Sequence, residues 1–372
     1  MGHLMAAVHG GDVEAVAREY GVPAAELTDF SASINPFGPP RSVMRRLQRD
    51  AADAVLLARY PDPRYSELRS ALATRLNVPP ECLAIANGSA ALFGAVIRSV
   101  RPNTCLLPVP AFSEQQQALA AAACRVARIP LSAAEGFRLD IRALCRTFED
   151  LRPSLCVLTN PHNPSGALTS AAEMLQVVRA AAACQVQLLV DEAFIDFSPG
   201  ETLTVEAAHS DHVVVLRSLT KFYGMPALRV GYAVSTPDVA ARVDAQLPAW
   251  SVTTLAAGAT VEALRDDDYA GRTLRAVAGD RQHFRERLAS YEIETYESAG
   301  NFLLLRLPQG GPDSTLLRTQ LIRKHRLVVR DCRSFDGMED GRFIRVAVRA
   351  RADNERFVAA VQSVLQEMSV AD

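Results

Sequence analysis

Between about residue 80 and residue 235, short apolar runs alternate with longer alanine-rich stretches, and this alternation limits the fold more than any other feature. The runs are apolar on both faces, which predicts an α/β fold with a mainly parallel central sheet and helices on both faces. Ligands of such sheets bind at the carboxyl ends of the strands. We expect strands at Leu83–Ala86, Thr104–Leu107, Leu155–Thr159, Gln187–Val190, Val213–Leu216 and Val230–Val234, and helices such as Ser113–Ala123 and Ala171–Cys184.

The pattern changes after a long helical stretch around Thr254–Leu288. Shorter segments follow, which predict a smaller C-terminal α+β domain with strands at Phe302–Arg306, Leu327–Val329 and Phe343–Val348 and helices at Asp313–His325 and Asn354–Glu367. The chain before Pro39 has a short helix, Val13–Tyr20, and much loop. We expect an N-terminal arm (residues 1–39) that packs on the small domain or on a partner subunit, a large domain (residues 40–260) and a small domain (residues 261–372).

Charge and cysteine usage narrow the class of protein. Forty basic residues against 42 acidic residues leave a net charge of −2, so no cationic field attracts nucleic acid or an anionic membrane. The seven cysteines are odd in number and form no CxxC pair, which argues against disulfides and a metal site. No apolar run reaches the roughly 20 residues that cross a bilayer, and Met1–Gly10 lacks the features of a signal peptide. We expect a cytoplasmic protein.

Lysine is scarce in this chain. Of the 40 basic residues only Lys221 and Lys324 are lysines. Arginine cannot replace lysine where a primary amine must lose its proton and attack a carbonyl. Lys324 lies in a basic surface-like run, whereas Lys221 follows the predicted strand Val213–Leu216, at the edge where chemistry is expected.

Two further predicted strands are followed by polar groups. Asp191 comes after Gln187–Val190, and an acid buried at a strand end needs a cationic partner. The segment Asn160-Pro161-His162-Asn163-Pro164-Ser165-Gly166 follows Leu155–Thr159. Its Asn-Pro and Ser-Gly steps force a turn that would fix both asparagines as hydrogen-bond donors.

Two elements suit a phosphate group. The segment Gly88-Ser89-Ala90 links a strand to a helix, and the free N–H groups of a helix start bind anions. Ser218 and Thr220 precede Lys221 and offer hydroxyl groups, and Arg229 offers a charge.

Pyridoxal 5′-phosphate requires this set of groups together. A lysine amine binds its aldehyde, an acid keeps its ring nitrogen protonated, an asparagine donates to its O3′ atom, and the two phosphate-binding elements hold its phosphate. The order of these groups on successive strand ends therefore predicts pyridoxal phosphate as the cofactor, with Lys221 and Asp191 as the catalytic pair.

With these motifs the chain resembles, over nearly its whole length, the fold-type I pyridoxal-phosphate enzymes of the class I/II aminotransferase superfamily. The resemblance implies that Lys221 carries the cofactor and that Asp191 pairs with the ring nitrogen. It places the turn that holds Asn160 and Asn163 near O3′, and of the two we favour Asn160 as the donor.

The resemblance implies roles for three residues outside these motifs. Tyr60, in Arg59-Tyr60-Pro61-Asp62, resembles a tyrosine that reaches the cofactor phosphate of a neighbouring subunit, which implies a homodimer with shared active sites. Phe112 stands where an aromatic ring stacks on the pyridine. Arg345, in Phe343-Ile344-Arg345-Val346, resembles the arginine that forks onto the substrate carboxylate.

Several stretches resemble the threonine-phosphate decarboxylases of cobalamin biosynthesis, a branch of this superfamily: His9–Asp12, Asp29–Pro36, Asp191–Phe197 and Phe343–Arg349. Their substrate, L-threonine O-3-phosphate, is a small phosphorylated amino acid with a carboxylate and a phosphate. The resemblance suggests that Arg345 binds the carboxylate, that Asn35 belongs to the substrate site, and that the phosphate is held by His9, Gly10, Arg330 and Arg349.

The motifs leave the reaction open. Histidinol-phosphate aminotransferases and related amino-acid aminotransferases carry the same residues, although the former more often have tyrosine where Phe194 stands. A serine-phosphate decarboxylase is a further alternative, because one methyl group gives limited discrimination. A non-catalytic binding protein is the least favoured, since both Lys221 and Asp191 are present.

Overall fold

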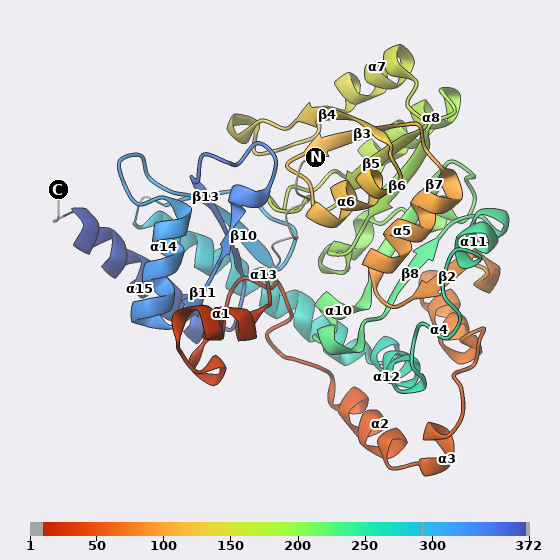
Figure 1. Ribbon diagram of the computed structural model, residues 1–372, viewed down its shortest axis with the longest axis horizontal. Helices are drawn as coiled ribbons and strands as arrows, with labels where there is room; N and C mark the ends of the chain where they lie inside the picture. Colours follow the sequence, from red (N-terminus) through yellow and green to blue (C-terminus); the bar gives the residue numbers. More distant parts are fainter. Residues whose placement is uncertain (1–9, 292, 370–372) are drawn as a thin grey trace.

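The computed structural model describes residues 10–291 and 293–369, and Figure 1 shows a large domain beside a smaller one. The large domain is built on a seven-stranded sheet in the order β2-β8-β7-β6-β5-β3-β4. Of these seven strands, β8 runs opposite to the other six, which are parallel to one another. The strands are β2 (Leu83–Ala86), β3 (Thr104–Val109), β4 (Arg125–Pro130), β5 (Leu155–Thr159), β6 (Gln187–Asp191), β7 (Val213–Ser218) and β8 (Gly231–Val234).

The sheet is buried on both faces because its strands are apolar on both faces. One face packs against α5 (Ser89–Val100), α6 (Ser113–Ala121) and α11 (Pro237–Asp244). The other packs against α4 (Ser66–Leu76), α7 (Ile141–Leu151), α8 (Ala171–Ala183), α9 (Thr204–Ala207) and α12 (Thr254–Leu264). Successive residues of β6 alternate between the two cores: Leu189 faces the first, and Leu188 and Val190 face the second. The predicted α/β class is therefore confirmed.

The small domain contains a four-stranded antiparallel sheet in the order β12-β13-β10-β9. Its elements are β9 (Glu294–Thr295), β10 (Phe302–Arg306), α14 (Ser314–Gln320) with a π-helical turn (Leu321–His325), β12 (Arg330–Asp331), β13 (Phe343–Ala347) and α15 (Arg351–Ser369). The predicted helical stretch near residues 254–288 consists of α12 and α13 (Asp267–Ala289), because Asp266 caps a new helix by accepting from Tyr269 N. Predicted strand Leu327–Val329 is β11 (Leu327–Val328), which lies outside the four-stranded sheet.

The described part of the arm lies on the small domain (Figure 1). Its strand β1 (Thr28–Asp29) pairs in parallel with β11, and α1 (Val13–Tyr20) places Val16 against Ile322 and Val328. Phe30 enters the small-domain core. After the arm, the chain enters the large domain with α2 (Arg41–Ala51) and α3 (Ala54–Leu57). The boundaries at residues 39 and 260 stay predictions.

Along the described residues, no helix is both long enough and apolar enough to span a bilayer.

Candidate active site

Lys221 lies in the short helix α10 (Leu219–Phe222), which begins directly after β7 at the carboxyl edge of the sheet. Its Nζ donates to Thr220 Oγ1 at 3.2 Å, and Thr220 Oγ1 lies 2.8 Å from Ser218 Oγ. Both hydroxyl residues are buried. The two hydroxyls that were predicted to bind phosphate therefore lie beside the amine.

The surroundings of Lys221 favour its neutral form. Burial, helped by the positive charges of Arg229 and Arg345, lowers the pKa of the amine to about 8, while the negative charge of Asp191 opposes this shift. The acid is thus within electrostatic range of the amine. A lysine with this pKa is neutral in a much larger fraction near neutral pH than an ordinary lysine, and the neutral nitrogen is what attacks an aldehyde.

Asp191 ends β6, the strand next to β7, and its side chain is buried. Oδ1 accepts from Ala193 N at 3.0 Å, and Oδ2 accepts from Gln115 Nε2 at 3.4 Å. Burial raises the pKa of this carboxyl, and these two hydrogen bonds and the charge of Lys221 act in the opposite direction. A cationic ring nitrogen is the partner that such a buried carboxylate needs.

The two asparagines of the predicted turn have different tasks. Asn160 closes the turn, because its Nδ2 donates to Thr169 O and its Oδ1 accepts from Thr169 N, both at 2.9 Å. Asn163 Oδ1 accepts from Arg345 Nη1 at 2.5 Å, and its Nδ2 makes no hydrogen bond within the described residues. The preference for Asn160 as the O3′ donor is therefore not supported, and Asn163 is the better candidate.

His162 stabilises the same turn. Its Nδ1 lies 2.7 Å from Ser165 Oγ and its Nε2 lies 2.8 Å from Pro110 O. Burial lowers the pKa of the imidazole to about 4. The ring is therefore neutral near neutral pH and acts as a structural link.

Gly88-Ser89-Ala90, the segment predicted to bind an anion, lies where β2 leads into α5. Gly88 has a φ of 82° and precedes the 12-residue helix α5, whose first N–H groups receive no side-chain cap. A Cβ added at Gly88 would lie 2.8 Å from Arg229 Nη2, so the guanidinium lies against this loop. A helix start with an adjacent arginine suits a phosphate group.

Arg330 and Arg345 are neighbours in the small domain, because the register of β12 and β13 pairs them. Both are buried. Arg345 donates to Asn163 Oδ1 and to Ser31 O, and Arg330 donates to Ser334 Oγ. All of these hydrogen bonds, within the part of the chain described, go to neutral oxygens. Burial lowers the pKa of both guanidiniums, that of Arg345 to about 10. Two buried cations that form no direct ion pair within the described residues suit an anionic ligand.

Gly10 and Arg330 line one cavity between the arm and the small domain. Gly10 lies so close to Ser31 that a Cβ would be 2.2 Å from Ser31 O. The neighbouring Gly11 N donates to Ser31 Oγ at 2.9 Å. Only glycine allows this approach of the arm to the loop that also binds Arg345. His9, predicted to act with Gly10, lies outside the described residues.

Two of the predicted substrate ligands have other partners. Asn35 donates through Nδ2 to Phe222 O at 2.6 Å and to Thr273 Oγ1 at 2.9 Å, and its backbone N donates to Lys221 O at 3.0 Å. It therefore fixes the lysine segment. The predicted substrate role is not supported, because its amide donor is already used.

Arg349 has a similar structural task. Its Nε pairs with Asp353 Oδ2 at 3.0 Å and its Nη1 donates to Asp29 O at 3.1 Å. Arg349 lies after the end of β13, four residues beyond Arg345, and its two contacts connect α15 with the arm. The predicted phosphate contact of Arg349 is therefore not supported.

Tyr60 and Phe112 keep their predicted roles as proposals. Tyr60 is 80% exposed and stacks on Trp250, with ring centroids 4.6 Å apart. Phe112 directly precedes α6, next to the strand ends of the site. Gln115, one turn further along α6, was not predicted, although the spacing of three residues from Phe112 places it on the same helix face.

The residues present fit pyridoxal phosphate. The uncapped helix start with Arg229 matches its phosphate, the buried carboxylate of Asp191 matches a protonated ring nitrogen, and the amine of Lys221 has the lowered pKa that aldehyde chemistry needs. The donor set of the site thus contains every group that the cofactor requires.

Comparisons with known proteins agree with this fit. The sequence model of the family described as "Aminotransferase class I and II" matches residues 25–364. The threonine-phosphate decarboxylase of Salmonella typhimurium is 37% identical over 374 residues, which cover 99% of this chain and 100% of that protein.

Two solved structures are similar over most of their length. The L-threonine-O-3-phosphate decarboxylase of Porphyromonas gingivalis has a TM-score of 0.80 at 25% identity and covers 91% of this chain and 99% of its own. The histidinol-phosphate aminotransferase of Sinorhizobium meliloti, in complex with pyridoxal 5′-phosphate, has a TM-score of 0.84 at 25% identity. The match covers 95% of this chain and 94% of that protein's chain.

Proposed function

The chain belongs to the class I and II aminotransferases and uses pyridoxal 5′-phosphate, and from this premise we propose that it is a threonine-phosphate decarboxylase. It would convert L-threonine O-3-phosphate into CO₂ and (R)-1-aminopropan-2-ol O-2-phosphate, as a step of cobalamin biosynthesis. The full-length similarity to the enzyme of Salmonella typhimurium supports this choice.

The observation that carries the proposal is the pair Arg330 and Arg345. The two cations are adjacent, buried and bonded only to neutral oxygens within the described chain. L-Threonine O-3-phosphate has two anionic groups, a carboxylate for Arg345 and a phosphate for Arg330 and the amides near Gly10. Histidinol phosphate has a phosphate but no carboxylate, so in an aminotransferase the second cation would instead serve the carboxylates of the amino acceptor.

The bound cofactor supplies an attachment point for the substrate amine and a ring that accepts the electron pair released at the substrate Cα. With the cofactor bound, Asp191 would hold a negative charge against the ring nitrogen, and Asn163 would donate a hydrogen bond from Nδ2 to O3′. Arg345 fixes the carboxylate that leaves as CO₂. Lys221, whose amine takes up a proton as the substrate amine is attached, would donate that proton to Cα, where it replaces the carboxyl group lost as CO₂.

The pKa of Lys221 predicts how cofactor attachment depends on pH. In cofactor-free protein, the rate at which added pyridoxal phosphate becomes covalently bound should rise with pH and level off above about pH 8, because the protonated amine has no free electron pair. A lysine with the usual pKa of 10.5 would continue to gain rate. Stopped-flow absorbance measures this rate, and a continued rise toward pH 10.5 would contradict the assigned environment.

The reaction is tested by incubating the purified protein with threonine phosphate, serine phosphate and histidinol phosphate, each with and without 2-oxoglutarate. We expect CO₂ and the amino-alcohol phosphate from threonine phosphate without any keto acid. Serine phosphate should react about 10- to 200-fold less efficiently, the usual effect of one missing methyl group. Turnover that requires 2-oxoglutarate would instead identify an aminotransferase, the alternative that the Sinorhizobium meliloti structure favours.

We also propose that the enzyme is a homodimer in which Tyr60 of one subunit contacts the cofactor phosphate of the other. Tyr60 is exposed and stacks on the exposed Trp250, and Val55 and Leu57 are exposed in the preceding helix α3. Exposed apolar and aromatic side chains that lie together on a surface are typical of a protein–protein interface whose partner is absent.

Shared sites predict complementation between inactive variants. Subunits carrying Tyr60→Ala and subunits carrying Lys221→Ala should recover about one quarter of the normal activity after mixing, because half of the dimers are mixed and each has one intact site. The measurement is turnover after dissociation and reassembly. No recovery, with mixed dimers shown by mass spectrometry, would contradict shared sites.

A further inference from the structure

The amide of Gln115 connects two neighbouring strand ends of the site. Gln115 lies in α6, is 1% exposed, and donates through Nε2 to Thr159 Oγ1 at 2.9 Å and to Asp191 Oδ2 at 3.4 Å. We propose that Gln115 is a positioning residue that fixes the Asp191 carboxylate against the cofactor ring. This inference rests on the proposed role of Asp191.

The carboxylate has few other groups to orient it. Ala193 N holds Oδ1, and within the described residues Gln115 is the side chain that donates to Oδ2. A buried acid that lost this donor would more readily take up a proton, because burial already raises its pKa and the donor of Gln115 lowers it. A protonated Asp191 could no longer offset the charge of a ring nitrogen.

Gln115 is well anchored for this task. Thr159 and Asp191 are register partners in β5 and β6, so one amide spans two adjacent strands at their carboxyl ends. The backbone of Gln115 donates to Phe112 O at 3.0 Å in the first turn of α6. Gln115 therefore links Phe112, the residue predicted to stack on the cofactor ring, to Asp191, the residue predicted to pair with the ring nitrogen.

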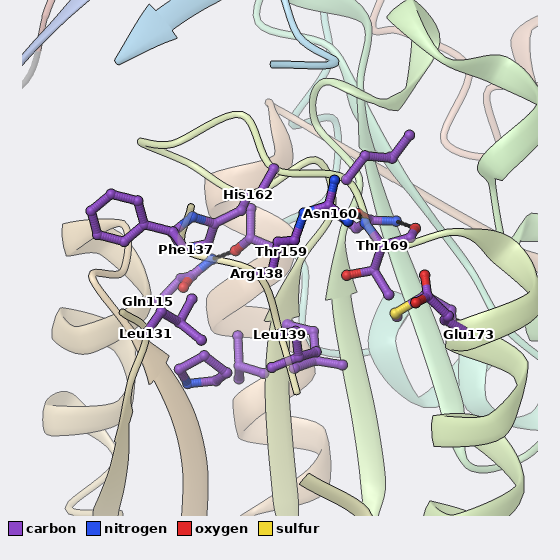
Figure 2. A pocket seen from close by; sticks show the side chains of 16 residues that line it. Gln115, Leu131, Phe137, Arg138, Leu139, Thr159, Asn160, His162, Thr169 and Glu173 are labelled. Atoms are coloured by element: carbon purple, nitrogen blue, oxygen red, sulfur yellow. Dashed lines mark hydrogen bonds between the residues drawn. The ribbon is translucent and has the colours of Figure 1, made fainter. Parts of the chain in front are cut away.

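Gln115 also lines a cavity of about 70 Å³ (Figure 2). Its wall includes the apolar side chains of Leu131, Phe137 and Met174. The polar side chains of Asn160 and His162 in this wall are bonded within the protein, so they do not offer a polar ligand site. The space allows Gln115 to be replaced by leucine without a steric clash.

The test compares Gln115→Leu, which removes the donor at similar size, with Gln117→Leu, the same change two residues away on α6. For Gln115→Leu we expect the dissociation constant of pyridoxal phosphate to rise roughly 10-fold, the lower end for a hydrogen bond to a charged group. The pH at which the absorbance of the bound cofactor changes should also shift. Gln117→Leu should leave both quantities as they are. Gln115→Glu, nearly isosteric, should weaken binding further, because two adjacent carboxyls compete for one proton.

A double-mutant cycle distinguishes positioning from packing. In an Asp191→Asn background the effect of Gln115→Leu on cofactor affinity should largely disappear, since its target is gone. Additive effects, or a Gln115→Leu protein with unchanged affinity and pH profile, would overturn the inference. The Asp191→Asn variant distinguishes a failure of this inference from a failure of the proposed role of Asp191. If Asp191→Asn binds the cofactor normally, the proposed role of Asp191 is wrong. If Asp191→Asn binds the cofactor weakly and Gln115→Leu binds it normally, only the positioning role of Gln115 is wrong.

Discussion

Replacing Lys221 with alanine should leave a folded protein that has lost the covalent absorbance band of the cofactor and roughly 10⁴-fold of its turnover. The side chain donates one hydrogen bond, to Thr220 Oγ1, and the bond between Ser218 and Thr220 stays without it. Stability should therefore change little. Absorbance spectra and steady-state turnover measure the loss, and circular dichroism checks the fold.

Two control variants show that the amine itself is required. Lys221→Arg keeps a positive charge but has no amine that can lose its proton, so it should be as inactive as Lys221→Ala. Lys324→Ala should behave like the unsubstituted protein, because Lys324 is half-exposed in the small domain and pairs with Glu367. Substantial turnover in Lys221→Arg, or a retained absorbance band in Lys221→Ala, would contradict the assignment.

The sheet could be predicted because its strands are buried on both faces. Leu155–Thr159 and Val213–Ser218 are nearly continuous apolar runs, and such runs mark strands without knowledge of their neighbours. The edge strand β4 was not predicted, because Arg125–Pro130 is only partly buried and includes two arginines. An edge strand is specified by its pairing with β3, which local sequence does not display.

The site could be predicted to the level of motifs but not of individual atoms. Asn160 and Asn163 have the same local context, Asn-Pro, and only the fold decides that one bonds Thr169 and the other Arg345. Similarly, Arg345 and Arg349 are four residues apart. The first lies within β13 and faces the site, and the second lies beyond the strand and bonds Asp353.

Contacts between distant segments were beyond prediction for a related reason. The pairing of Arg330 with Arg345 depends on the register of β12 and β13, and Asn35 reaches the Lys221 segment only because the arm crosses from the small domain to the large one. Register and chain crossing are set by packing over the whole molecule. Residues with such contacts look like ordinary polar residues in the sequence.

Substitution of Arg345 should remove recognition of the substrate while the cofactor stays bound. The Arg345 guanidinium is buried and held by Asn163 and Ser31 O, so its position is fixed before a carboxylate arrives. Loss of one partner of a buried, hydrogen-bonded charge pair costs about 2–5 kcal/mol. For Arg345→Leu we therefore expect kcat/KM for threonine phosphate to fall by about 30- to 5,000-fold. Steady-state kinetics measure this fall.

Arg345→Lys separates charge from geometry. A lysine keeps the positive charge but cannot form two parallel hydrogen bonds to a carboxylate, so it should recover only part of the lost kcat/KM. Arg306→Leu is a matched control, because Arg306 lies on the adjacent strand β10, is half-exposed and pairs with Glu294. It should keep normal kinetics. If Arg345→Leu kept its kcat/KM, or lost cofactor absorbance instead, the carboxylate site would have to lie elsewhere, and the buried charge of Arg345 would serve the cofactor or the fold.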